Sequence, residues 1–176
     1  MRNFFFALAM ITFTYLSCVQ ASELGNWKIG TFVDEFGDKT SDTYITIKTK
    51  GFFSNTATEN SPLNVTMMIE KEWLEDPYFK FYEYAGNNPI KGYYSSGHIY
   101  NCKIKNSKNE INSIPLKLSD GSSILVLNTV YHNLDDWLED GEKVKFYCYD
   151  TNRETSTYKF AFDFKNYNEA LERLKD

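Results

Sequence analysis

The sequence predicts a mainly β protein: a single antiparallel β-sandwich or barrel-like domain of about nine or ten strands, with two short helices near its C-terminal end. Three observations predict it. Apolar residues alternate with polar ones along many short segments, turn residues separate these segments, and helical periodicity is found near the C-terminus. Short strands at such intervals, without helices between them, are typical of antiparallel sandwiches and barrels.

The first 21 residues form a separate element. Arg2 gives a positive start, an apolar or weakly polar run of 13 residues follows over 4–16, and Val19-Gln20-Ala21 ends with the pattern that a signal peptidase cleaves. The run is shorter than the roughly 20 residues that a membrane-spanning helix needs. We therefore expect a signal peptide over 1–21, a single β-rich domain over 22–176, and an exported protein that is periplasmic or secreted.

Cys18 leaves a second interpretation of this segment open. A lipoprotein signal also places a cysteine after a small residue, and the mature chain then begins at that cysteine and carries lipid. Tyr15 and Leu16 fit a lipoprotein signal poorly. The alternatives are a free module that begins at Ser22 and a lipid-anchored one that begins at Cys18.

Strand-like alternation extends along the mature chain. The first segment is 27–33, in which Trp27, Ile29, Thr31 and Val33 occupy alternate positions. Residues 124–127 are apolar at every position, which predicts a central strand covered on both faces. Clusters of Gly, Asn, Asp and Pro supply the turns. The remaining alternating segments are 45–47, 63–69, 79–81, 114–118 and 160–164.

Two helices are expected, near 134–140 and near 167–175. Asn133 can cap the first helix, and Gly141 can end it in the left-handed conformation. Asn166 opens a segment that matches a capping box in form. Four residues of the second helix recur at helical spacing and are expected to lie on the sheet: Tyr167, Ala170, Leu171 and Leu174.

The charge balance limits the partners. Removal of the signal peptide leaves 155 residues with 18 basic and 24 acidic side chains, a net charge of −6. An excess of acid argues against nucleic acid and against an anionic membrane surface, because both are bound through Lys and Arg. No motif for a cofactor is present, so none is expected.

Two cysteines, Cys102 and Cys148, remain in the mature chain. In an oxidising compartment such a pair suggests a disulfide. Cys102 shares a strand face with Tyr100 and Ile104, and the residues around Cys148 alternate in the same way, so both thiols are expected in the core. A disulfide would stabilise the fold by about 4 kcal/mol. Two unpaired buried thiols are the alternative.

An acidic loop raises the question of a metal site. Asp34, Asp38 and Asp42 offer oxygen ligands, but an EF-hand needs Gly at its sixth position and Glu at its twelfth, where this chain has Lys39 and Ile45. We expect a solvated hairpin loop and no metal.

Catalytic motifs are absent from the sequence, which lacks G-x-S-x-G, H-E-x-x-H and C-x-x-C. His98 and Cys102 would lie about 13 Å apart on one strand, too far for a dyad. Four carboxylates gather on the first expected helix, where they form a solvated face: Asp135, Asp136, Glu139 and Asp140. We expect no enzyme and no catalytic residue, and a hydrolase with residues from separate strands is the third hypothesis.

Aromatic residues are in excess, at 17% of the chain. Alternation places several tyrosines opposite the apolar face of their strand, and two more adjoin a Gly-rich turn. Amphipathic tyrosines on a sheet face suit protein or sugar contacts. The alternative is that both faces of the fold are covered and these rings are core. The candidate binding residues are Tyr82, Tyr84, Tyr93, Tyr94, Tyr147 and Tyr149.

The C-terminal third resembles a known group of proteins. A strand over 158–164 followed by an Ala-Leu helix over 167–174, together with Trp27 leading a strand into Asp34, is similar to small exported bacterial β-sandwich proteins of unassigned function. It is more distantly similar to periplasmic accessory proteins of type VI secretion systems. The resemblance concerns architecture and implies no functional residue.

The leading hypothesis is therefore an exported, non-enzymatic envelope or secreted module that binds another macromolecule, a protein or glycan of the cell envelope, through a Tyr-rich sheet face or loops. The alternative is an inhibitor or immunity-type protein that blocks an exported enzyme or toxin, because small size and acidity suit that role.

Overall fold

The computed structural model describes residues 24–72, 74, 77–90, 98–118, 125–127, 132–151 and 155–176. The predicted signal peptide and Cys18 lie outside these residues. The described part contains nine strands and two helices, which confirms the mainly β class. In chain order they are β1 Trp27–Val33, β2 Lys39–Asn55, β3 Thr58–Glu70, β4 Tyr78–Glu83, β5 Ile99–Lys105, β6 Ile111–Leu118, β7 Leu125–Leu127, α1 His132–Glu139, β8 Lys143–Asp150, β9 Thr157–Asp163 and α2 Tyr167–Lys175.

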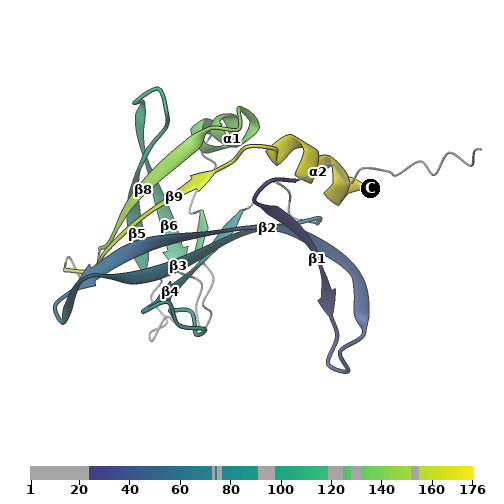
Figure 1. Cartoon of the computed structure of the whole chain (residues 1–176), viewed down its shortest axis with the longest axis horizontal. Helices are drawn as coiled ribbons and strands as arrows, with labels where there is room; N and C mark the ends of the chain where they lie inside the picture. Colours follow the sequence, from purple (N-terminus) through teal and green to yellow (C-terminus); the bar gives the residue numbers. More distant parts are fainter. Residues whose placement is uncertain are drawn as a thin grey trace, which may run out of the picture.

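All strands belong to one antiparallel sheet (Figure 1). Hydrogen-bonded neighbours follow the order β1-β2-β3-β4-β7-β6-β5-β8-β9, and β9 also pairs with β2. This last pairing joins β9, at one end of the order, to β2, so the eight strands from β2 to β9 follow one another around a curled, barrel-like sheet and β1 lies outside it. Residues 125–127 of the predicted strand form β7, which lies between β4 and β6, and residue 124 lies outside the described residues.

The long strand β2 has two partners on one of its edges. Its N-terminal half pairs with β1, and its C-terminal part, from Gly51 to Ser54, pairs with β9. At Gly51 the backbone of β9 comes so close that an added Cβ would lie 2.7 Å from the Cβ of Phe160 and would clash with the carbonyl oxygen of Lys159. Glycine is therefore needed where β9 meets β2.

The core lies inside the curled sheet. Alternate residues of β3, β4, β5, β6, β8 and β9 are buried there, and aromatic rings fill much of the space. Phe146, for example, stacks on Phe160 at 4.8 Å between ring centroids. Cys102 and Cys148 are fully buried, face each other on β5 and β8, and form the predicted disulfide.

Both predicted helices are confirmed, and they lie together at one end of the sheet (Figure 1). Gly141 follows α1 in the left-handed conformation, as expected. The predicted cap at Asn133 is wrong, because α1 begins at His132 and Asn133 lies within the helix. The capping box at Asn166 is wrong: this residue has a φ of 64°, and its side chain makes no capping hydrogen bond. An N-cap side chain reaches the helix from extended backbone, whereas Asn166 is in a left-handed turn.

Strand β1 differs from the expected half-buried strand. Trp27 is buried against Phe164 and Tyr167, but Ile29 and Val33 are 43% and 60% exposed. The β1–β2 hairpin extends away from the rest of the sheet (Figure 1), so its far part has no core to face. Alternation predicts a strand, but burial also requires a layer beneath it.

Candidate functional site

The register of three strands assembles a basic face on the outside of the sheet. On β8, Lys145 lies beside Lys105 of β5, and Tyr147 lies between Lys103 of β5 and Lys159 of β9. Side chains on neighbouring strands are about 5 Å apart, and those two residues apart along a strand are about 7 Å apart. We define the basic face as Lys103, Lys105, Lys143, Lys145, Lys159 and Tyr147.

The charges of the basic face are only partly offset by the described residues, because Asp163 of β9 lies opposite Lys143 of β8. Four of its lysines are exposed and Lys105 is half-buried. The ion pairs within the described ranges are His98 with Asp150, and Lys108 with Asp140 and Glu142, so the five lysines have no ion-pair partner there. The face therefore has five lysines beside one carboxylate, a positive local charge in a chain whose formal net charge is −5.

Tyr147 provides an aromatic surface at the centre of this face. Its side chain is 39% exposed, and the Lys159 ammonium lies 5.8 Å from its ring centroid. Phe52 of β2, which is 56% exposed, lies opposite Lys159. Aromatic and cationic side chains therefore alternate along one row, from Phe52 through Lys159 and Tyr147 to Lys103.

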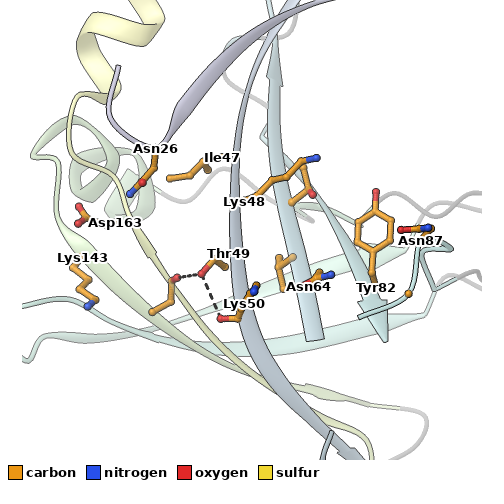
Figure 2. A pocket seen from close by; sticks show the side chains of 14 residues that line it. Asn26, Ile47, Lys48, Thr49, Lys50, Asn64, Tyr82, Asn87, Lys143 and Asp163 are labelled. Atoms are coloured by element: carbon orange, nitrogen blue, oxygen red, sulfur yellow. Dashed lines mark hydrogen bonds between the residues drawn. The ribbon is translucent and has the colours of Figure 1, made fainter. Parts of the chain in front are cut away.

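A groove adjoins the basic face along β2, between the part of β2 that pairs with β1 and the part that pairs with β9. We call it the fork groove, and its volume is about 790 Å³. Figure 2 shows Tyr82 and Asn87 at one end, Asn26, Lys143 and Asp163 at the other, and Thr49 and Lys50 of β2 between them. The Thr49 hydroxyl donates a 2.7 Å hydrogen bond to the carbonyl oxygen of Ala161 and so links β2 to β9 (Figure 2).

The fork groove offers several kinds of polar group. Lys48, Lys50 and Lys143 contribute ammonium groups, and Asp163 contributes the opposite charge. Three amides also line it, and each can donate and accept hydrogen bonds: Asn26, Asn64 and Asn87. Because Lys143 belongs both to the groove and to the basic face, the two form one continuous surface.

A second hollow lies at the end of the sheet opposite the helices. We call it the mouth cavity, and its volume is about 1000 Å³. The hydroxyl of buried Tyr158 donates a 2.8 Å hydrogen bond to Oε1 of Glu83. Burial, together with Tyr100 and Glu83, raises the pKa of Tyr158 well above its usual range. Asp150 is 4% exposed, and Nδ1 of His98 lies 3.7 Å from its carboxylate.

The candidate tyrosines are distributed over different parts of this surface. Tyr82 lines the fork groove, and Tyr84, on the segment after β4, lines the mouth cavity. Tyr147 and Tyr149 are on β8, and three strands separate β8 from β4 in either direction around the sheet. The candidates therefore do not form one cluster. Tyr93 and Tyr94 lie outside the described residues.

The acidic loop forms the tip of the β1–β2 hairpin. The Asp34 carboxylate accepts hydrogen bonds from the backbone N–H groups of Phe36 and Asp38, both at 2.9 Å. Asp42 accepts one from the Ser41 hydroxyl. The Asp34 carboxylate therefore holds the turn. Within the described ranges, no three His, Cys, Asp or Glu side chains gather to bind a metal ion.

Neither the basic face nor the mouth cavity was predicted from the sequence. The lysines of the face come from positions 103–105, 143–145 and 159, which are far apart in the chain and disappear in an acidic total. The sequence signal for the basic face is that Lys alternates with buried residues in K-I-K, K-V-K and Y-K-F. These three segments lie on the neighbouring strands β5, β8 and β9.

Comparisons with protein-family models, with curated proteins and with solved structures find no match to this chain. Among the described residues, no helix is long and apolar enough to span a membrane. The site must therefore be interpreted from its own geometry.

Proposed function

We propose that this chain is an exported, non-enzymatic module of the cell envelope or the secreted fraction, and that it binds an acidic polysaccharide across the basic face and the fork groove. The observation that carries the proposal is the gathering of five lysines without ion-pair partners among the described residues, around an exposed tyrosine, in a chain of negative net charge.

The chemistry of the surface suits a polymer that carries both anionic and hydroxyl groups. Lysine ammonium groups attract carboxylate or sulfate groups without requiring one fixed geometry. The asparagine amides of the groove can donate to and accept from hydroxyl groups. The ring of Tyr147 offers an amphipathic surface for a sugar ring. The continuous face also has room for several sugar units, as a polymer requires.

The test compares binding of the mature chain to polygalacturonate and to neutral dextran. We expect binding to polygalacturonate that weakens with added salt, because exposed charge pairs are screened, and no binding to dextran. Equal binding to both polymers, or binding that salt does not affect, would contradict the proposal. Tighter binding to DNA than to polygalacturonate would assign the face to nucleic acid instead.

Charge-matched variants locate the contact. The variant Lys103→Gln/Lys145→Gln/Lys159→Gln removes three charges from the basic face. With each surface contact worth about 0.2–1 kcal/mol, three lost contacts total about 0.6–3 kcal/mol, so we expect affinity for polygalacturonate to fall about three- to a hundredfold. The control variant removes three exposed charges elsewhere and should bind nearly as wild type does: Lys39→Gln, Lys71→Gln and Lys175→Gln.

The β1–β2 hairpin favours a second candidate function, an inhibitor that blocks an exported enzyme or toxin. The hairpin extends away from the sheet (Figure 1), and Phe36 near its tip is 82% exposed. An exposed aromatic residue on a projecting hairpin suits insertion into a pocket of a partner protein. If the chain is an inhibitor, the variant Phe36→Ser should no longer block the partner enzyme and should bind polygalacturonate as wild type does. A variant that changes polysaccharide binding alone would contradict the inhibitor function.

A further inference from the structure

The mouth cavity is a second, independent site. The inside of an eight-stranded barrel is nearly filled by side chains but can hold one small ligand at its open end. Here α1 and α2 lie at one end of the sheet, and the cavity lies at the other, where β4, β8 and β9 end or begin. It shares no lining residue with the fork groove.

The described lining of the mouth cavity is acidic and aromatic. Its acidic side chains are Glu83 and Asp150, and the basic side chain among its described lining residues is His98, which faces Asp150 and leaves Glu83 without a basic neighbour in that lining. Rings of Tyr84, Tyr100 and Tyr158 border the same space. Such a lining disfavours an anionic ligand and favours a cationic one, because carboxylates and ring faces both attract positive charge.

Glu83 provides the specific contact. Its side chain is half-buried on the inner face of β4, and Tyr158 holds it by donating to Oε1. Within the described part of the chain, Oε2 has no hydrogen-bond donor. A held carboxylate oxygen at the edge of a cavity can accept a charged hydrogen bond without first losing another partner.

The rim beside Glu83 adds apolar surface. Tyr84 is 59% exposed, and its ring meets that of Phe53 edge-on at 4.8 Å, which fixes its orientation. Ile90 and Leu118 also line the cavity. A ligand with a short hydrocarbon chain behind its charged group would cover these side chains.

We propose that the mouth cavity binds a small organic cation, an aliphatic primary amine whose ammonium group donates to Oε2 of Glu83 while its chain packs against Tyr84 and Leu118. This site lies apart from the polysaccharide surface, so either proposal can fail while the other holds.

The test uses three probes with the same chain and different head groups: hexylamine, hexanol and hexanoate. Chemical-shift titration of the full mature chain at neutral pH measures each affinity. We expect hexylamine to bind tightest and hexanoate weakest, with the largest shifts at the amides of Glu83, Tyr84 and Leu118. Equal affinities, the reverse order, or shifts confined to other residues would overturn the proposal.

Two variants separate the charge from the apolar contact. In Glu83→Gln we expect hexylamine affinity to fall about ten- to a hundredfold, the range for loss of a charged hydrogen bond, with hexanol affinity unchanged. Tyr84→Ser, at an exposed position, should weaken hexylamine and hexanol alike. Unchanged hexylamine binding in a folded Glu83→Gln protein would refute the site, and polygalacturonate binding should remain as in wild type in both variants.

Discussion

Replacement of both bonded cysteines gives the most quantitative prediction for the fold. Cys102 and Cys148 are fully buried and directly opposite each other on β5 and β8. The double variant Cys102→Ala/Cys148→Ala removes the disulfide without leaving a reactive thiol. It leaves the β5–β8 backbone pairing in place, so the native sheet can still form.

The size of the effect follows from the chain that the disulfide closes. The two cysteines are 46 residues apart in sequence. In the chain-entropy model, a loop of this length restricts the unfolded chain by about 4 kcal/mol at 25 °C. For a chain of 150–250 residues, each kcal/mol shifts Tm by about 2–4 °C, so Tm should fall by about 8–16 °C. The loss of buried sulfur atoms acts in the same direction.

Thermal and urea unfolding, followed by circular dichroism, measure the change. The wild-type chain is compared with the double variant, each with and without reductant. We expect reductant to lower the wild-type Tm close to that of the variant and to leave the variant unaffected. The free energy of unfolding should change and the native spectrum should not.

Two results would refute this reasoning. An oxidised wild-type protein that melts within about 2 °C of the double variant would mean that the disulfide contributes almost nothing. A Tm of the double variant that falls on addition of reductant would mean that the reductant acts elsewhere.

Three further changes test other parts of the structure. Gly51→Ala should destabilise the fold by several kcal/mol in urea unfolding, because β9 leaves no space for a Cβ; wild-type stability would show that β9 does not approach β2 so closely. Tyr158→Phe removes the donor to Glu83 and should cost about 1.5 kcal/mol in the same assay, whereas Tyr84→Phe, at an exposed position, should cost nothing. Burial, helped by two nearby carboxylates, raises the pKa of Tyr167 to about 12. The free energy of unfolding of wild type, measured relative to that of Tyr167→Phe, should therefore be at its highest below about pH 10 and should decline as pH rises toward 12. A relative stability that grows over this range would contradict the raised pKa.

Local features of the fold could be predicted from the sequence. Alternation located the strands, helical spacing located α1 and α2, and the facing patterns of Cys102 and Cys148 predicted a buried pair, all of which the structure contains. These features depend on residues that are close in sequence. The exposure of Val33 was not predictable in this way, because it depends on how far the β1–β2 hairpin extends beyond the core.

The candidate site could be predicted only in part. Tyr147 was a candidate, and it lies at the centre of the basic face. Its neighbours Lys103 and Lys159 could not be identified, because they are brought together by strand order and register, and a shift of one residue would turn each of them to the other face. The mouth cavity likewise depends on Glu83 and Tyr158, which are close only after the sheet has curled.

The central claim is that the basic face and fork groove form one binding surface for an acidic polysaccharide. Backbone chemical-shift mapping of residues 22–176 during titration with oligogalacturonate tests it most directly. We predict perturbed amides over 103–105, 143–147 and 159 and along the groove at Thr49 and Lys50, with little change at the tip of the β1–β2 hairpin over 34–38. Shifts concentrated at that tip or at the mouth cavity, with the lysine strands unaffected, would contradict it.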